Sequence, residues 1–292
     1  MATVPMRTTS KRIQARIAIN HIVKALFFGA VLFACLLLGV LFFRIISEGA
    51  SYLTTDFFQN YGSRFPAKAG IKAALVGSIY LMLIVAPVSI FIGVCSAIYL
   101  EEYAKKNRFT DFLRMNISNL AGVPSIVFGL LGLTIFVRAL AMGNSLLAAG
   151  LTMSLLILPV IIVASQEAIR SVPKDIREAS YGMGATKWQT IYRVVLPSAV
   201  PSILTGSILA LSRAVGETAP LVVLGIPVIV QFLPDGFLSQ FTALPMQIYD
   251  WAKRPQEAFT YVASAGIIVL MVLLIMMNSV AIYLRNKFSN RV

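Results

Sequence analysis

The chain has 292 residues, of which 58% are hydrophobic and 13% are charged, and its mean hydropathy is +0.82. These values exclude an ordinary water-soluble globule and favour a protein with several membrane spans. The formal net charge of +13 would also suit a nucleic-acid-binding protein, but the basic residues are scattered in short segments between apolar stretches. That distribution is typical of membrane topology, so no nucleic-acid partner is expected.

Six apolar stretches in chain order are predicted to be membrane-spanning helices. A basic N-terminal segment, residues 1–24, precedes the first stretch, whose length and bulky end favour an uncleaved span over a signal peptide. The predicted spans cover about 25–43, 73–100, 117–139, 146–164, 201–224 and 261–284. Residues 25–284 are therefore predicted to form one all-α transmembrane domain with six helices.

The basic residues predict the orientation of these spans. Of the 25 Lys and Arg residues, seventeen fall in segments assigned to the cytoplasm and six in segments assigned to the outside, as the positive-inside rule requires. Both termini, including residues 285–292, are therefore predicted to be cytoplasmic. The longest inner segment covers about 166–199, and the longest outer loops cover about 47–70 and 225–260. In the second outer loop, residues 245–258 are predicted to form an amphipathic helix on the membrane surface or dipping into it.

The inner segment has the pattern of two short helices joined by a turn. Pro173 suits the first turn of a helix, and Gly182 and Gly184 mark its end. Thr186 followed by Gln189 predicts a capping box that begins the second helix. An ordinary solvated loop does not need this much structure, so we expect the segment to contact something in the cytoplasm.

The fifth predicted span carries two charged residues, Arg213 and Glu217. Their spacing of four places them on one face of a helix, with Arg213 roughly 18 Å from Pro201 and hence near the bilayer centre. An isolated charge there costs at least about 2.5–3.5 kcal/mol, so the pair must face protein or a water-filled path. The pair is either a buried structural ion pair or a site where Arg213 binds an oxyanion. The second interpretation is favoured, with Glu217 balancing the charge and Thr218 as a hydroxyl donor.

The same span carries small residues at steps of four, a pattern that allows another helix to approach closely. They are Ser202, Gly206, Ala210 and Ala214. Beyond them, Gly216 and Pro220 are expected to weaken the helix and free backbone groups toward a cavity.

Little in the sequence suggests covalent or metal chemistry. Cys35 and Cys95 lie inside apolar stretches, and the only histidine, His21, precedes the first one. These residues supply neither a disulfide framework nor a zinc site. Because the chain also lacks a G-x-x-x-x-G-K-[ST] loop, it does not provide the phosphate cradle for ATP. No catalytic residue, metal or cofactor is expected in this chain.

Three runs of residues resemble sequence patterns of known transport proteins. EAS at 178–180, followed at the right spacing by Gly184 and by VVLP at 194–197, resembles the EAA signature of ABC-importer permeases. Ser in place of the second Ala, and Val in place of Ile, are mild departures. RAVGETAP at 213–220 and VPSIVFG at 123–129 resemble runs of phosphate-importer permeases of the Pst type. The resemblance covers nearly the whole chain.

The resemblance implies a permease subunit of a type I ABC importer with the MetI-like fold, located in the inner membrane. It implies that the inner segment, with Glu178 and Ala179 in its signature, docks into a groove on an ATPase. Glu178 would pair with a basic partner or with the loop itself, and Gly184 would allow the tight turn. Leu196 and Pro197 would direct the chain into the membrane.

The resemblance also implies the substrate, phosphate, and three protein partners. These are a second related permease subunit, an ATPase dimer that holds ATP and Mg, and an extracytoplasmic phosphate-binding protein that meets the outer loops. Two alternatives remain open at this point. One is a permease for another oxyanion, such as sulfate, molybdate or phosphonate. The other is an ion- or proton-coupled carrier with Glu217 as its proton site, although such a carrier has no use for an ATPase-docking element.

Overall fold

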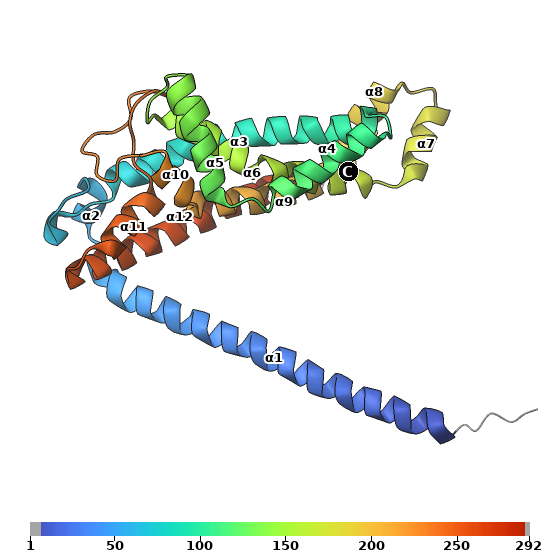
Figure 1. Cartoon of the computed structure of the whole chain (residues 1–292), viewed down its shortest axis with the longest axis horizontal. Helices are drawn as coiled ribbons and strands as arrows, with labels where there is room; N and C mark the ends of the chain where they lie inside the picture. The colour runs from blue at the N-terminus through green and yellow to red at the C-terminus, as the bar shows by residue number, and fades with distance from the viewer. Residues whose placement is uncertain (1–6, 290–292) are drawn as a thin grey trace, which may run out of the picture.

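The computed structural model describes residues 7–289, and over that range the chain forms helices, turns and loops without a strand, which confirms the all-α prediction. The long helices are α1 (Arg7–Gly49), α3 (Lys72–Ile98), α6 (Leu146–Arg170), α9 (Leu196–Gly216) and α12 (Glu257–Ser289). Figure 1 shows four of them, α3, α6, α9 and α12, running side by side as a bundle. Residues 1–6 and 290–292, parts of the two predicted cytoplasmic ends, lie outside the described residues.

Within the described residues, five helical stretches are long and apolar enough to cross a membrane. They are Ile13–Tyr52, Lys72–Tyr103, Leu146–Arg170, Lys187–Gly216 and Glu257–Lys287. A sixth crossing is obtained when the bent pair of helices between α3 and α6 is counted as one span. The predicted number of six therefore depends on that bent pair.

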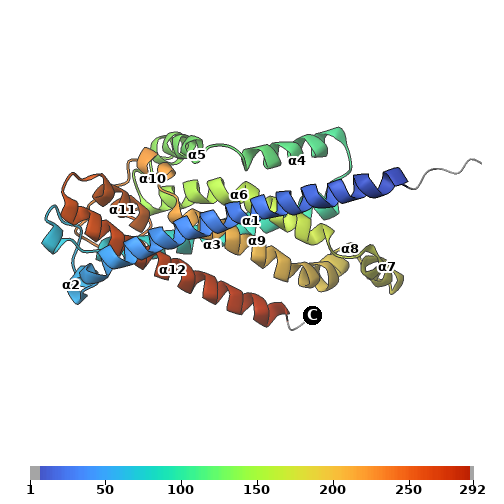
Figure 2. The same ribbon diagram turned by 90° about the horizontal axis from the view of Figure 1, so that it is seen from below.

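The third predicted span is not a single helix. Residues 117–120 belong to α4 (Arg108–Leu120), and α5 (Ser125–Gly132) then continues through a π-helical turn, η4 (Leu133–Ala139). The two pieces meet at an angle of 104°. Figures 1 and 2 show α5 standing across the direction of the bundle. The bend has a local cause, because Pro124 lacks a backbone N–H and disfavours helical geometry in the residue before it.

The fifth predicted span begins earlier and ends earlier than expected. The helix is continuous from Lys187, through α8 (Lys187–Thr190), the π-helical turn η5 (Ile191–Val195) and α9, to Gly216. Glu217 is extended, and a short helix, α10 (Ala219–Val223), packs on α5. Gly216 is a weak helix former, and Pro220 could not donate to its carbonyl, so the helix stops there.

The end of the bundle that carries the two predicted outer loops is built from short elements, including α2 (Thr55–Gln59) and α11 (Leu244–Lys253). α11 replaces the interfacial helix predicted at 245–258, and it is packed inside the protein against α12 and α3. Trp251 and Leu244 are buried, and the Leu244 N–H donates to the Ser78 hydroxyl at 2.8 Å. The approach to α12 is close because Gly266 has no side chain where the Trp251 ring lies.

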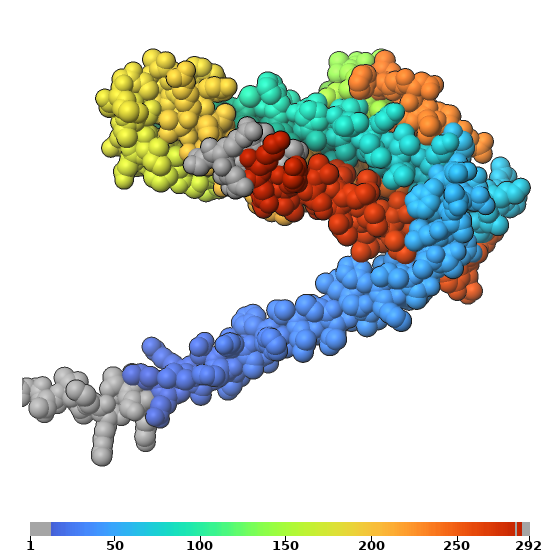
Figure 3. Space-filling view, turned by 180° about the vertical axis from the view of Figure 1, so that it is seen from behind, coloured from blue at the N-terminus to red at the C-terminus, as the bar shows by residue number. Residues whose placement is uncertain are grey.

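Among the described residues, helix α1 contacts the rest of the chain only near its C-terminal end. There a Cβ on Gly49 would lie 2.6 Å from the Ala265 nitrogen, and the Ser264 hydroxyl donates to Glu48 at 3.2 Å. From that contact the helix stands away from the bundle, as Figures 1 and 3 show. Its large apolar side chains are exposed along its length, including Phe27 at 70% and Phe43 at 75%. A long apolar helix of this kind needs lipid or another protein around it.

Candidate functional site

The inner segment folds as two helices joined by a tight turn, and Figure 1 shows it at one end of the bundle. The first is α7 (Lys174–Gly182), with Pro173 as the residue before it, and the second is α8. Gly184 adopts φ +82°, a conformation that favours glycine. Thr186 and Gln189 form the complete capping box at the start of α8.

A buried contact joins the two helices of this segment. The hydroxyl oxygens of Ser180 and Thr190 lie 2.9 Å apart, and both residues are buried. Ser180 is one of the two positions where the sequence departs from the EAA signature, and here its hydroxyl forms the link. The two helices and their turn, residues 174–190, therefore form one compact unit, which we call the coupling element.

The outer surface of the coupling element is apolar in places. Met183 is 85% exposed and Trp188 is 62% exposed, with the Trp188 ring stacked on Tyr192 at 6.2 Å between ring centroids. Glu178 and Ala179 are exposed on the same unit. Sequence reasoning missed Met183 and Trp188, although two large apolar residues in a polar segment are themselves a signal. Exposed apolar side chains on a rigid unit are typical of a protein-docking surface.

Arg213 and Glu217 lie together, but at a helix end and not along a helix. Arg213 is in the last turn of α9, and its Nε donates to the Glu217 carboxylate at 3.2 Å. Glu217 is the first residue beyond the helix, so the prediction of one helical face carrying both is wrong in this detail. The cause is the helix end at Gly216. The positive charge of Arg213 is also favourable near the C-terminal dipole of α9.

The side chains of Arg213 and Glu217 differ strongly in their exposure to solvent. The side chain of Arg213 is 58% exposed and that of Glu217 is 18% exposed. Thr218 follows directly and is the residue before α10. Within residues 7–289, no hydrogen bond occupies the two terminal nitrogens of the Arg213 guanidinium. These nitrogens form the planar fork that binds two oxygens of an anion.

A second polar contact lies one residue before Arg213. The Ser212 hydroxyl donates to the Asn278 side chain at 2.6 Å and so joins α9 to α12. Sequence reasoning did not single out Asn278, although an amide in an apolar span is an available signal.

Two of the sequence runs that carry the resemblance pack against each other. A Cβ on Gly129, in α5, would lie 2.9 Å from the Cα of Pro220 and 3.0 Å from the Cβ of Val223, both in α10. The absence of a side chain at Gly129 thus lets α5 support α10 immediately after the break at Glu217. The bent third span and the broken fifth span form one contiguous feature, which we call the broken-helix site.

The small residues of α9 lie in different surroundings. A Cβ on Gly206 would be 2.5 Å from the Ala164 side chain in α6, and Ala210 and Ala214 are buried. Ser202 is exposed instead. Leu196 and Pro197, half-buried at the start of α9, do not interrupt the helix that comes from the coupling element. The π-helical turn η5 directly precedes them and leaves the helix continuous.

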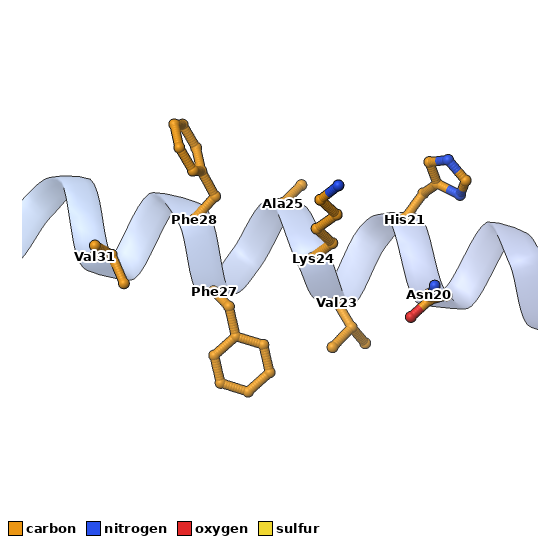
Figure 4. Close-up of a pocket in the computed structure, with 8 residues that line it drawn as sticks. All are labelled: Asn20, His21, Val23, Lys24, Ala25, Phe27, Phe28 and Val31. Carbon is orange, nitrogen blue, oxygen red and sulfur yellow. The ribbon is translucent and has the colours of Figure 1, made fainter. Parts of the chain in front are cut away.

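A shallow hollow of about 910 Å³ lies between residues 140–147 and the loop 235–239. Another, of about 780 Å³, is lined entirely by side chains of α1 between Asn20 and Val31. Figure 4 shows these side chains projecting from a single helix, with no second element facing them. The Nδ1 atom of His21, on this helix, lies 2.8 Å from the Ile17 carbonyl oxygen. Within the described residues, no three His, Cys, Asp or Glu side chains gather to hold a metal ion.

Comparison with known proteins defines the class of this fold and site. Residues 89–290 match the family described as binding-protein-dependent transport system inner membrane component. The chain belongs to this family of multi-pass membrane permeases, which are components of ABC transport systems.

Two relatives show which kinds of permease the chain is similar to. The chain is 34% identical over 261 residues to the phosphate transport system permease protein PstA 1 of Mycobacterium tuberculosis, covering 87% of this chain and 84% of that one. It is 41% identical over 192 residues to the probable ABC transporter permease protein YqgI of Bacillus subtilis. That alignment covers 66% of this chain and 65% of YqgI, just under two thirds.

Solved structures show the same fold. A chain of a bacterial alginate ABC transporter, solved with an alginate-bound periplasmic protein, matches with a TM-score of 0.61 at 16% identity, covering 92% of this chain and 96% of that one. A chain of the MetNI methionine ABC transporter in an inward-facing conformation matches with a TM-score of 0.59 at 18% identity, covering 74% and 96%. The MetI-like importer permease fold is thereby confirmed.

Proposed function

We propose that this chain is the transmembrane permease subunit of an ATP-driven phosphate importer. It forms part of the path for inorganic phosphate and receives the energy of ATP hydrolysis from a cytoplasmic ATPase. The observation that carries the proposal is the exposed Arg213 guanidinium beside Glu217 at the end of α9. The similarity of the chain to permeases named for phosphate transport supports phosphate as the substrate over sulfate, molybdate or phosphonate.

Arg213 is suited to a transported oxyanion. Its Nε is engaged by Glu217, so the carboxylate balances the charge while the terminal nitrogens remain available for two phosphate oxygens. A permease must bind its substrate weakly enough to release it, and the carboxylate of Glu217 competes with phosphate for the guanidinium. Thr218, at the start of the next helix, supplies a hydroxyl to the same site.

The coupling element is the proposed contact with the ATPase dimer, which holds ATP and Mg. Met183 and Trp188 would fill apolar depressions in a groove on that partner, and the exposed Glu178 would pair with a basic residue there. The described parts of both chain ends lie toward the end of the molecule that carries this element, as Figure 1 shows. That arrangement, together with the distribution of basic residues, supports the proposal that both termini of this membrane protein are cytoplasmic.

The other partners occupy the remaining surfaces. A second related permease subunit would cover the free apolar face of α1, giving a heterodimer surrounded by membrane lipid. An extracytoplasmic phosphate-binding protein would meet the outer loops at 47–70 and 225–260. Alternating access would then open the path between the two permease subunits inward or outward as ATP binds and is hydrolysed on the partner.

Co-purification from detergent, followed by ATPase measurement, tests this proposal. Gly184→Trp places a bulky side chain in the turn at a positive φ, and we expect it to abolish capture of the ATPase. Gly143→Trp is the matched control, because Gly143 also has a positive φ (+64°) and no atom lies within 4 Å of its added Cβ, but it lies outside the coupling element. Stimulation of ATPase activity by phosphate-loaded binding protein is the expected result for the wild-type assembly. Capture without phosphate stimulation would move the substrate to another oxyanion, and no ATPase partner would contradict the proposal as a whole.

A further inference from the structure

The end of α3 is joined to the elements around it by a group of ion pairs. The helix ends in a π-helical turn, η3 (Tyr99–Tyr103), which carries two adjacent carboxylates, Glu101 and Glu102. Their side chains are only 9% and 7% exposed. Three arginines from three other elements contact them, and none of the five residues was singled out for a function from the sequence. We call the group the inner clamp; its members are Glu101, Glu102, Arg114, Arg170 and Arg177.

Glu101 connects η3 to α6 and α4. Arg170, the last residue of α6, donates to its two oxygens at 2.9 and 2.7 Å in the bidentate geometry that is strongest for this pair. Arg114 of α4 approaches the same carboxylate at 3.4 Å and donates to the Leu100 carbonyl at 2.6 Å. One carboxylate thus holds three helix segments at the inner end of the bundle.

Glu102 connects η3 to the coupling element. It pairs with Arg177 of α7, and Arg177 also donates to the Ile169 carbonyl in the last turn of α6 at 2.6 Å. That carbonyl lies among the groups that a helix leaves unsatisfied at its C-terminus. A second connection comes from α8, where the Lys187 ammonium lies 4.9 Å from the centre of the Tyr103 ring. The coupling element is therefore attached to η3 from both of its helices.

Apolar packing does not replace these contacts. A buried apolar cluster joins the inner ends of α3, α6 and α9, and none of its members belongs to α7. Its members are Ala97, Ala168, Ile169, Val172, Val195, Ala199 and Ile203. Within the described chain, α7 itself packs mainly on α8 and η5, which follow it in sequence. Arg177 is thus the residue through which α7 is bonded to the span helices α3 and α6.

We propose that Glu101 and Glu102 are positioning residues for transport, which make the coupling element and the inner ends of α3 and α6 move as one body. Opening the clamp would leave nearly buried charges without partners, so a displacement of α7 is transferred to the spans and not absorbed at the joint. The inference rests on the proposed docking of an ATPase on the coupling element. It adds the route by which that motion reaches the membrane.

The coupling test compares uptake with hydrolysis in proteoliposomes that contain the full importer. Glu102→Gln and Arg177→Met each break the link from η3 to α7, and Glu102→Arg with Arg177→Glu reverses it. Glu167→Gln is the matched control, because Glu167 contacts Arg170 from the surface with its side chain 68% exposed. We expect each single variant to keep ATPase capture and ATP hydrolysis while phosphate taken up per ATP falls at least about fivefold. The double variant with the reversed pair should recover part of the lost phosphate uptake per ATP.

An unchanged ratio in Glu102→Gln would overturn the proposal, because a merely structural pair would lower expression or assembly without changing coupling. If Glu102→Gln fails to assemble, Glu102→Asp keeps the charge and shortens the side chain by one methylene. A lowered ratio in assembled Glu102→Asp would then support the proposal, and a normal ratio would overturn it.

A measurement that needs no substrate separates this inference from the proposed function. Spin labels at Met183 on the coupling element and Phe91 on α3, both well exposed, report the distance between the two parts in a chain without its native cysteines. We expect one narrow distance distribution for the wild-type chain and a broad one for Glu102→Gln. Equal distributions would overturn the clamp even where phosphate transport is shown, and a broadened one would support it even where phosphate is not the substrate.

Discussion

The contact of Gly129 with α10 predicts a specific consequence of adding one methyl group. In Gly129→Ala, the new Cβ would lie 2.9 Å from the Pro220 Cα, 3.1 Å from the Pro220 carbonyl oxygen and 3.0 Å from the Val223 Cβ. Carbon atoms in favourable contact are about 3.5–4.0 Å apart, so α5 and α10 must separate by roughly half an ångström or more. Two of the three atoms belong to the backbone and cannot rotate away.

Overpacking of this kind typically costs about 1–3 kcal/mol, and the backbone contacts place Gly129→Ala near the upper end, at about 2–3 kcal/mol. For a chain of this size, that loss lowers the unfolding midpoint by roughly 5 °C. Because α10 begins directly after Thr218, phosphate uptake should fall as well. The assays are thermal unfolding in detergent and uptake in proteoliposomes.

Two further variants make the test specific. Gly122→Ala lies in the same bent connection, but the nearest atom to its Cβ is the Asn119 carbonyl oxygen at 3.5 Å, an ordinary contact. It should leave both the unfolding midpoint and uptake unchanged. In a Val223→Gly background the close Cβ atom is gone, so Gly129→Ala should cost less stability there than in the wild-type chain, which a double-mutant cycle measures. If Gly129→Ala and Gly122→Ala behave alike, the packing of α5 on α10 does not position the broken-helix site.

Three other predictions concern the coupling element and the broken-helix site. Arg213→Gln removes the charge beside Glu217 and should abolish phosphate uptake while ATPase capture stays normal; normal uptake by a correctly inserted variant would contradict the substrate role. Trp188→Ser, together with Met183→Ser, should weaken binding of the ATPase by about 30-fold or more, as expected when a buried aromatic anchor is lost, whereas an unchanged pull-down would place the contact elsewhere. Thr186→Ala removes the capping box of α8 at a cost of about 1 kcal/mol, which should appear as faster amide hydrogen exchange in α8 alone.

Much of the bundle could be predicted from apolar length. Helices α3, α6 and α12 contain the predicted spans 73–100, 146–164 and 261–284 almost completely, because each has a continuous apolar run and their internal prolines, where present, do not end the helix. The predicted third and fifth spans differ because a hydropathy average does not register the direction of the chain. Pro124 and Pro220 were visible in the sequence, but Pro87 and Pro159 lie inside intact helices. Whether a proline ends a helix depends on what packs beside it.

The candidate site, too, was only partly predictable from the sequence. Local rules predicted the capping box at Thr186 and the turn at Gly184, since these depend on neighbouring residues only. The inner clamp could not be predicted, because Glu101 and Arg170 are 69 residues apart and their pairing exists only after α3 and α6 have packed. The role of Gly129 was equally invisible, as its partner Pro220 lies in a helix whose direction depends on the break before it.

The attachment of α1 has a consequence for how the protein is made. This helix is synthesised first, yet the residues that hold its outer end belong to α12, the last helix, and Glu48 and Ser264 are separated by 216 positions. After its synthesis, α1 must therefore remain in the bilayer without its contact to α12 until α12 has also been inserted. Among the described residues, most of its length has no contact with the rest of the chain even then, so lipid or another protein must cover it. If a second subunit covers it, copies made without that subunit would expose the helix to the bilayer for their whole lifetime.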